Sequence, residues 1–343
     1  MKNILQKLTR ANSLEQSEID QLIFGLKEDR FTPTQIAGFL MGLVMKGPTT
    51  DEISYIAQAM RRACVTINPQ AEKLTDTCGT GGGLTTFNVS SANSLVSAAA
   101  GVNIAKHGSR SISSSSGSAD VLEALGIEVE IAPTVAEKMI EEHGFAFLYA
   151  PFYHPVMLKV FGPENDLGIK TIFFTIIGPL INPAGAKRHL LGVYRPELVD
   201  QVARVIADLD FEHVMVVHGV DGLDEISLIG ETRIAEVVNG IVKYYTVKPE
   251  DFGLKRCSLD DVHGGSPDYN AQVIMDIFEG RDQGPRRDKL ILNTAATLVI
   301  ADKAGSIHEG LEIARQTIDS GKALAKLREI QAASQVIREA ALN

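Results

Sequence analysis

The sequence of 343 residues has few cysteines, no tryptophan and no long hydrophobic run. Its three cysteines, Cys64, Cys78 and Cys257, are scattered and form no C-x-x-C pair, which argues against a zinc site or a disulfide framework and fits buried thiols in a reducing compartment. The amino-terminal stretch MKNILQKLTR lacks the apolar segment that a signal peptide or a membrane span needs. We therefore expect a cytoplasmic protein that does not associate with membranes.

Positive charge is also scarce. The chain has 33 Lys and Arg against 43 Asp and Glu, which gives a formal net charge of -10, and it has no Lys/Arg-rich run. Because nucleic-acid-binding proteins usually carry a basic face, this balance disfavours nucleic acid as a partner. Hydrophobic residues make up 45% of the chain, enough for a sizeable core, and the length fits one large domain plus a smaller one.

Helix signals dominate the beginning of the chain. Three pairs of polar residues have the spacing of a capping box, in which two side chains satisfy free backbone N–H groups at a helix start. These pairs are Ser13 with Gln16, Thr32 with Gln35, and Thr49 with Glu52. Apolar residues follow each pair at helical spacing. We expect a helical domain over residues 1–70, against which a later segment near residues 160–185 packs.

After this region, short apolar runs alternate with helical stretches. The runs are LTDTCGT, VNIAKHG, IEVEI, FAFLYA and HVMVVHG. Runs separated by helices are typical of β-α-β units and a mainly parallel sheet. Shorter spacings between EISLIG, RIAEVV and IVKYYTV favour antiparallel strands over residues 225–247. The sequence therefore predicts an α/β fold, in which residues 71–343 form a large domain with a central, mostly parallel sheet flanked by helices.

A glycine run, Asp76–Gly83, follows one predicted strand and precedes a helix that begins near Asn88. Such a loop lets backbone N–H groups approach an anion, and the helix start adds partial positive charge. The run alone is equally compatible with a flexible turn, and its spacing does not fit a dinucleotide fingerprint. Asn88, Ser90 and Ser91 at the helix start can either cap the helix or bind phosphate.

A second loop of this kind follows the next predicted strand. Lys106 to Arg110, the string KHGSR, leads through the serine-rich residues 111–118 to another helix start. Ligands of open parallel sheets bind at the carboxyl ends of the strands, so two such loops at neighbouring strand ends predict a phosphate or pyrophosphate site. A serine-rich loop by itself is more often a solvated linker.

Two adjacent carboxylates, Asp224 and Glu225, follow the strand HVMVVHG. An isolated Asp-Glu pair is usually a charged turn. Beside two phosphate-binding loops, however, the pair favours Mg²⁺ bridged to phosphate oxygens.

Several strings together identify a family. DTCGTGG, NVSS, KHGSR, SGSADVLEALG, APFYHP, GPLINPA and VVHGVDGLDEISL occur in this order, and LNTAATLVIADKA and DSGKAL follow them. With these strings the chain resembles the anthranilate phosphoribosyltransferases over nearly its whole length. The resemblance implies the nucleoside-phosphorylase-like fold, a hinge between the two domains and a homodimer built through the helical domain. It also implies transfer from 5-phosphoribosyl diphosphate (PRPP) to anthranilate or a related small aromatic amine, with Mg²⁺ and release of pyrophosphate, in tryptophan biosynthesis.

The resemblance assigns roles to individual residues. One group would hold PRPP: Gly79, Gly82, Gly83, Thr86, Asn88, Ser90, Ser91, Lys106, Ser114 and Ser118. A second group would bind two Mg²⁺: Ser90, Asp224 and Glu225. Lys106 with the two carboxylates would be the catalytic residues, which stabilise the leaving pyrophosphate. A third group would line the acceptor route: His107, Ser109, Arg110, Pro151, Tyr153, His154, Glu164 and Phe174. No general base is implied, because an amine acceptor needs little activation.

The sequence departs from the family's pattern mainly in the acceptor half. Ser109 replaces the asparagine of KHGNR, Glu164 the arginine of VRxxLG, and Phe174 the asparagine of TIFN. The glycine loop is one residue short and lacks the aspartate after Gly82. An arginine that holds a carboxylate contributes about 1.5–3 kcal/mol per charge-assisted bond, whereas a carboxylate in its place repels an anion.

These departures leave alternatives to anthranilate. The first is a neutral or cationic acceptor in the same fold. A nucleoside phosphorylase is a second, although the retained metal and pyrophosphate residues disfavour it. A third is a non-catalytic relative that binds nucleic acid or a regulatory partner, which the acidic net charge and the retained Asp224 and Glu225 disfavour.

Overall fold

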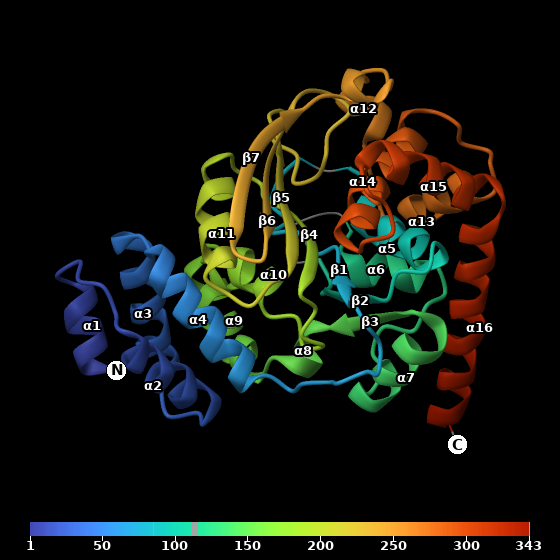
Figure 1. The fold of residues 1–343 in the computed structure, drawn as a ribbon. Coiled ribbons are helices and arrows are strands. Elements are labelled where there is room, and N and C mark those ends of the chain that lie inside the picture. Colours follow the sequence, from blue (N-terminus) through green and yellow to red (C-terminus); the bar gives the residue numbers. More distant parts are fainter. Residues whose placement is uncertain (85, 112–115, 343) are drawn as a thin grey trace.

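The structure is a computed structural model that describes residues 1–84, 86–111 and 116–342 (Figure 1). Four helices form a bundle at the amino-terminal side: α1 (Lys2–Leu8), α2 (Gln16–Lys27), α3 (Pro33–Lys46) and α4 (Thr50–Ala63). At the starts of α3 and α4 the side chains of Thr32 and Thr49 accept backbone N–H bonds, as their capping boxes predict.

The prediction for Ser13 is wrong. Helix α2 begins after Glu15, and Glu15 and Glu18 form its capping box. The buried Leu14 donates its N–H to Oε1 of Glu52 on α4, at 2.9 Å. We attribute the later helix start to this contact, because it anchors the residue before Glu15 to α4.

The rest of the chain forms a seven-stranded sheet with helices on both sides. The strands are β1 (Thr75–Asp76), β2 (Ile104–Gly108), β3 (Phe145–Tyr149), β4 (Arg188–Gly192), β5 (His213–Gly219), β6 (Thr232–Val238) and β7 (Ile241–Val247). The longer helices are α5 (Val89–Ala99), α6 (Ser118–Ala124), α7 (Pro133–His143), α9 (Pro155–Leu167), α11 (Glu197–Ala207), α13 (Pro267–Phe278), α14 (Pro285–Ile300), α15 (Ile307–Asp319) and α16 (Lys322–Leu342). Short turns of helix are α8 (Ala150–Tyr153), a π-helix (Phe173–Ile177), α10 (Gly178–Leu180), a 3₁₀ turn (Pro249–Phe252) and α12 (Leu259–Val262).

The strand order is β3-β2-β1-β4-β5-β6-β7. Strands β1 to β5 run parallel to their neighbours, whereas β6 and β7 continue the sheet antiparallel. This architecture confirms the predicted fold class. The chain adds β2 and β3 on one side of β1 and then β4 and β5 on the other, so the order reverses between β1 and β4. Open parallel sheets bind their ligands at such a reversal.

Two predicted strands are absent from the sheet. The IEVEI segment is not a strand, although Ile127, Val129 and Ile131 are buried in the core beside helices. The EISLIG segment is not a strand either, because side chains satisfy its backbone: Asn293 bonds both backbone groups of Ile226. Strand β4 was not predicted, since its sequence RHLLG has no clear alternation.

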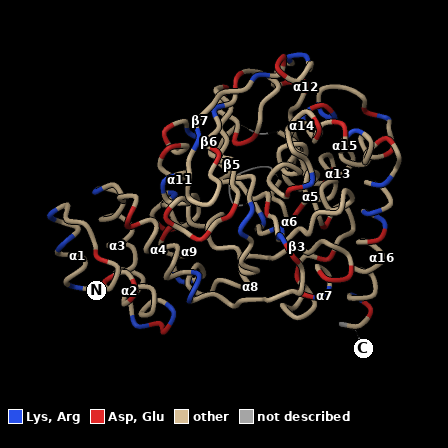
Figure 2. Tube along the Cα trace, viewed as in Figure 1, with Lys and Arg blue, Asp and Glu red and all other residues tan. Residues whose placement is uncertain are grey.

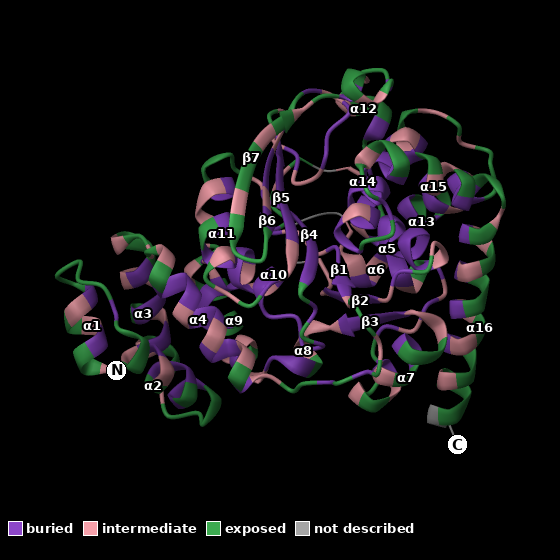
Figure 3. Ribbon diagram, in the orientation of Figure 1, coloured by how far each residue is buried: buried purple, intermediate pink, exposed green. Residues whose placement is uncertain are grey.

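The two faces of the sheet belong to two cores. Along β4 and β5, which pack on α14, Leu190, Met215 and Val217 belong to one core, whereas Leu191 and Val216 belong to the core that α11 shares with the helical bundle. This alternation follows from the period of two in a strand. Figure 3 shows β4 and β5 buried, whereas much of β7 is exposed.

The bundle contacts the sheet domain through two helices. Helix α4 packs on α11, and α9 packs on α2 and α3, with Val156 and Val160 in the shared core. Helix α16 lies on the opposite side of the molecule (Figure 1). Within the described residues no helix has the length and hydropathy to cross a membrane. Lys and Arg are interspersed with Asp and Glu along the trace (Figure 2).

Candidate active site

The loops after β1, β2, β4 and β5 meet at the carboxyl ends of these strands. They surround a cavity of about 190 Å³ at the reversal point between β1 and β4. Its lining includes the glycine loop, the start of α5 and the carboxylate pair. Loops that are far apart in the sequence are therefore brought to one site.

The glycine loop is held tightly against the neighbouring strand ends. Thr80 donates its N–H to the carbonyl of Gly192 at 2.8 Å, and Gly81 donates its N–H to Oδ2 of Asp224 at 3.0 Å. A Cβ at Gly83 would lie 2.6 Å from the carbonyl oxygen of Gly222. Gly82 has a φ of +87°, a conformation that other residues rarely adopt. Glycine is thus required here by close approach and by backbone geometry.

Asn88 precedes the first turn of α5, but its side chain makes no capping bond there. Its amide donates to the carbonyl of Ser116, and its Oδ1 accepts from Asn270 on α13 at 2.8 Å. The capping alternative for Asn88 is therefore wrong. The residue instead fastens the end of the serine-rich loop to the start of α5. Ser91 is fully buried, and among the described residues its hydroxyl has no hydrogen-bond partner.

Lys106 brings a positive charge under the cavity. Its side chain is buried, and its Nζ lies 3.3 Å from Oγ1 of Thr77 and 3.4 Å from Oγ of Ser90. Burial lowers the pKa of this ammonium group, because the charged form is poorly solvated. The residue joins the strand end of β2 to the first turn of α5, where a phosphate oxygen would meet both the hydroxyl and the charge.

The carboxylate pair lines the same cavity. Thr86 donates its hydroxyl to Oε1 of Glu225 at 2.6 Å, and Nζ of Lys289 lies 3.0 Å from the same oxygen. Burial raises the pKa of both Asp224 and Glu225, since it disfavours their charged forms. A bound cation would compensate for this cost.

The ligands at this site fit Mg²⁺. Two carboxylates and the hydroxyl of Ser90 are hard oxygen donors of the kind that Mg²⁺ prefers. Among the described residues, no three His, Cys, Asp or Glu side chains cluster as a complete metal cage. A Mg²⁺ here would therefore take its remaining ligands from water or from the phosphate oxygens of a substrate, as is usual for this ion.

The described ends of the second loop meet at the start of α6. The hydroxyl of Ser118 donates to the carbonyl of Ser109 at 3.3 Å, and the N–H of Gly117 donates to Asp120 at 2.8 Å. Gly108 permits this closure, because a Cβ there would lie 2.3 Å from the hydroxyl oxygen of Ser118. The predicted ligand Ser114 lies outside the described residues.

Two buried histidines lie beside this loop. The Nε2 atoms of His107 and His154 are 3.1 Å apart, and their rings meet edge to face. Burial lowers the pKa of His107 to about 4 and that of His154 well below its ordinary value. Both rings are neutral at pH 7, so one Nε2 donates to the other. Pro151 and the fully buried Tyr153 belong to α8, directly before His154.

The remaining acceptor candidates have other partners. Glu164 is buried on α9 and accepts the N–H of Thr171, and burial raises its pKa. Phe174 stacks edge to face on Phe161, with ring centroids 5.7 Å apart. Arg110 pairs with Glu123 on α6 and with Glu130. Contact of these side chains with an acceptor stays a prediction.

Four residues of the site received no role from the sequence. Asp76 and Asn182 hold the strand ends, and Lys289 and Asn293 on α14 hold the carboxylate segment. The position of Asp76 at the start of the glycine run is a sequence signal that could have identified it as a site residue. For Lys289 and Asn293 the signal is weaker: they are polar residues among the apolar residues of 289–300.

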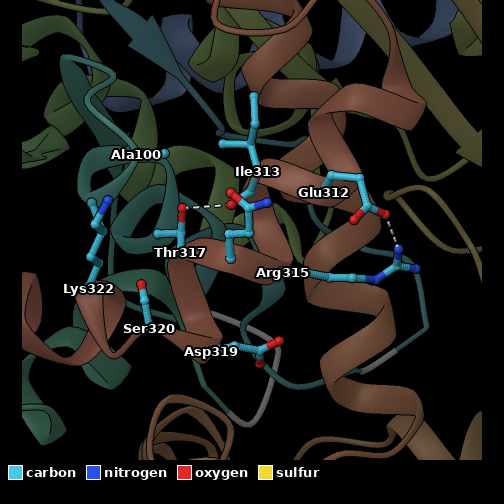
Figure 4. Close-up of a pocket in the computed structure, with 10 residues that line it drawn as sticks. Ala100, Glu312, Ile313, Arg315, Thr317, Asp319, Ser320 and Lys322 are labelled. Carbon is cyan, nitrogen blue, oxygen red and sulfur yellow. Dashed lines mark hydrogen bonds and ion pairs between the residues drawn. The ribbon is translucent and has the colours of Figure 1, made fainter.

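A larger hollow of about 710 Å³ lies between α5, α15 and α16 (Figure 4). Its charged residues are largely paired: Arg315 with Glu312 at 2.6 Å, and Asp319 with Arg287 at 2.5 Å. Its lining contains neither a glycine loop nor a carboxylate pair. We therefore place the active site in the smaller cavity.

Fold and site together define a two-domain glycosyltransferase. Residues 2–64 match the helical bundle domain of the glycosyl transferase family, and residues 71–324 match its a/b domain.

Individual relatives narrow this class. The anthranilate phosphoribosyltransferase of Persephonella marina is 46% identical over 334 residues, which are 96% of this chain and 98% of the relative. The crystal structure of that enzyme from Thermus thermophilus matches with a TM-score of 0.90 and 38% identity, over 97% of this chain and 99% of the other. The Saccharomyces cerevisiae enzyme in complex with PRPP and Mg matches with a TM-score of 0.88 and 28% identity, over 97% of each chain. The chain belongs to the anthranilate phosphoribosyltransferase family, as its motifs predicted.

Proposed function

We propose that this enzyme transfers the phosphoribosyl group of PRPP to anthranilate and releases pyrophosphate, with Mg²⁺, in tryptophan biosynthesis. The observation that carries the proposal is the convergence of the glycine loop, the start of α5 and the Asp224–Glu225 pair on one cavity, with Lys106 against Ser90 of its lining. Structures of the yeast relative with PRPP and Mg and with 4-fluoroanthranilate support it.

In this proposal the cavity binds the donor. Backbone N–H groups of the glycine loop, the hydroxyls of Ser90 and Ser91, and the ammonium of Lys106 surround the diphosphate. Two Mg²⁺, held by Ser90 and by the carboxylate pair, would neutralise charge that develops on the leaving pyrophosphate. Lys106, beside Ser90, would act in the same direction, and its effect would be large because it is shielded from water. Ser118 bonds the carbonyl of Ser109 and Asn88 that of Ser116, which holds the described ends of the second loop in place.

The acceptor would enter beside His107 and His154. Their lowered pKa values keep both rings neutral, so they offer hydrogen bonds without charge. The repulsion expected between Glu164 and an anionic acceptor is weakened, because this carboxylate accepts a backbone N–H and its pKa is raised. We therefore propose anthranilate itself as the acceptor. Closure of the helical bundle over the sheet would align the amine with the ribose and exclude water.

The proposal is tested by the release of pyrophosphate from PRPP and Mg²⁺ with and without anthranilate. Anthranilate-dependent release is the expected result, and it should disappear when EDTA is present. Tight binding of PRPP without turnover of anthranilate would contradict the acceptor but not the donor. A panel of neutral and cationic aromatic amines would then identify the acceptor.

We further propose that the enzyme is a cytoplasmic homodimer joined through its helical bundle. Large apolar side chains are exposed on helices that pack together there, among them Phe24 on α2, Met45 on α3 and Leu158 on α9, with exposed fractions of 50%, 78% and 55%. Burial against a second copy would remove them from water. Light scattering during size-exclusion chromatography should give twice the mass of one chain, and Met45→Asp with Leu158→Asp should give the monomer.

A further inference from the structure

A buried lysine, Lys289, forms an ion pair with the carboxylate pair. The side chain of Lys289 is fully buried on α14, and its Nζ lies 3.0 Å from Oε1 of Glu225, whose own side chain is only 12% exposed. The positive charge of Lys289 also acts on Asp224, where it opposes the effect of burial. A buried ammonium group at this place is expensive unless it is paired, so its presence requires an explanation.

Lys289 is fixed in place by its neighbours. One turn further along α14, Asn293 donates to the carbonyl of Lys289 and to the carbonyl of Ile226, both at 3.0 Å, and accepts the N–H of Ile226 at 3.0 Å. Ile226 directly follows Glu225 in the chain. The backbone at the carboxylate pair and the backbone at the lysine are thus joined by one buried amide, which holds the two segments that carry the ion pair side by side.

The charges at this site set its affinity for metal. Asp224 and Glu225 together carry two negative charges, and Lys289 cancels one of them. A free divalent cation therefore meets a site with a net charge of about minus one, in which Oε1 of Glu225 already has two partners. Because Coulomb energies in a buried site are large, the ammonium must weaken the binding of any cation close to it.

We propose that Lys289 is a resident counter-charge of the Asp224–Glu225 pair, which keeps this pair weakly binding for free Mg²⁺ and makes its metal enter together with the diphosphate of PRPP. The phosphates supply the negative charge that the lysine removes, so the site reaches high affinity only when the donor substrate is present. Lys289 is in this sense a positioning residue that couples metal binding to substrate binding. The part of the inference that concerns PRPP rests on the proposed function.

The test counts free Mn²⁺ by its EPR signal while the full-length protein is titrated at pH 8, first without PRPP and then with it. Mn²⁺ stands in for Mg²⁺, since carboxylate oxygens suit both ions. The wild type should bind Mn²⁺ weakly alone and tightly with PRPP. Lys289→Met, which keeps the length of the side chain but not the charge, should bind Mn²⁺ without PRPP roughly tenfold more tightly than the wild type.

Two further variants sharpen the test. Lys289→Gln keeps a hydrogen-bond donor for Glu225 without the charge, so it provides the same comparison if the methionine variant folds poorly. Lys46→Met is the matched control: Lys46 also forms a deeply buried pair, with Glu52 at 2.6 Å, on helices of the bundle. Its removal should lower the stability without any gain in affinity for Mn²⁺.

A second readout uses heat. Because a ligand that binds the folded state raises its melting temperature, MgCl₂ without PRPP should raise the Tm of both Lys289 variants more than that of the wild type. Variants that are folded by circular dichroism and bind Mn²⁺ no more tightly than the wild type would overturn the proposal. So would tight binding of free Mn²⁺ by the wild type. Failure of the wild type to bind PRPP in calorimetry would instead contradict the proposed function, and the comparison without PRPP would still decide the role of Lys289.

Discussion

Asn182 donates its side-chain amide to Oδ2 of Asp76 at 2.8 Å, and also to the carbonyl of Ala105 at 2.8 Å. The other carboxylate oxygen of Asp76 accepts the backbone N–H groups of Thr77, at the start of the glycine loop, and of His107, at the end of β2. One buried carboxylate therefore fixes both phosphate-binding loops. Asn182 connects it to the segment that returns from the helical bundle.

Removal of this amide should loosen both loops. We expect Asn182→Ala to lower the free energy of unfolding by roughly 1–3 kcal/mol, because it leaves the buried Asp76 and Ala105 with an unmade hydrogen bond. The affinity for PRPP should fall as well. Urea unfolding and calorimetry measure the two effects. Asn165→Ala, at an exposed position of α9, is the control and should change neither quantity appreciably.

The close approach of the end of β4 to the carboxylate pair leads to a second prediction. A Cβ at Gly192 would lie 1.6 Å from the backbone oxygen of Asp224. Gly192→Ala must therefore displace the carboxylate segment, and we expect loss of most of the Mg²⁺-dependent binding of PRPP. Gly162→Ala is matched to it, since a Cβ there meets nothing within 4 Å and the residue lies in a helix.

The control should be neutral or should stabilise the protein by about 0.5–1 kcal/mol, as replacement of a helical glycine by alanine usually does. Equal loss of PRPP binding in both variants would show that the close approach at Gly192 is not what matters.

Much of the fold could be predicted from the sequence, because local sequence patterns agree with the helices and strands that form. Thr32 and Thr49 start helices where their spacing predicts, and the strands with the longest apolar runs lie in the sheet. The phosphate-binding loops were found because parallel strands bring their carboxyl ends to one edge of a sheet.

The wrong predictions of local structure have a common cause: side chains from distant segments decide the structure at these positions. Leu14 is anchored by Glu52 of another helix, and this moves the start of α2. The EISLIG segment has the composition of a strand, but Asn293 takes the backbone bonds of Ile226. No sequence pattern near these residues reports such a partner.

The same limit applies to the site. Lys289 follows Glu225 by more than sixty positions, and only the packing of α14 against the carboxylate segment brings the two together. Glu164 stood out in the sequence as a misplaced charge. The structure instead gives it a backbone partner, Thr171, that no alignment of motifs could indicate.

The buried histidine pair makes stability depend on pH. The pKa of His107 is lowered from 6.5 to about 4 in the folded state, so between these values the unfolded chain binds a proton that the folded chain does not. Stability should therefore fall as the pH drops from 6.5 towards 4, and His107 alone would account for roughly 3 kcal/mol of this loss.

Urea unfolding between pH 4.5 and 7.5 measures this dependence. His107→Gln should show a shallower decline than the wild type, whatever its stability at pH 7. His308→Gln, at an exposed position, should keep the slope of the wild type. Parallel curves for the wild type and His107→Gln would rule out the histidine as the origin of the effect.

Lys106 should show a conflict between stability and function. Among the described residues its buried ammonium has two hydroxyls as hydrogen-bond partners, at 3.3 and 3.4 Å from Thr77 and Ser90, and burial lowers its pKa. We expect Lys106→Met to weaken the binding of PRPP roughly 10- to 100-fold, through the loss of a charge-assisted bond to phosphate. The variant should nevertheless be as stable as the wild type or more stable, because it no longer buries a charge.

The pH dependence of stability distinguishes the effect of the buried charge of Lys106 from an effect of packing. A lysine whose folded pKa lies below its unfolded value of 10.5 costs stability below the folded pKa, and this cost disappears as the pH rises towards 10.5. The wild type should therefore gain stability relative to Lys106→Met at alkaline pH. Lys73→Met, which removes an exposed lysine paired with Asp302, should show no such difference. If Lys106→Met were instead strongly destabilised near pH 7 and still bound PRPP normally, Lys106 would be a structural residue, and the phosphate would have to be held by the glycine loop and the start of α5 without it.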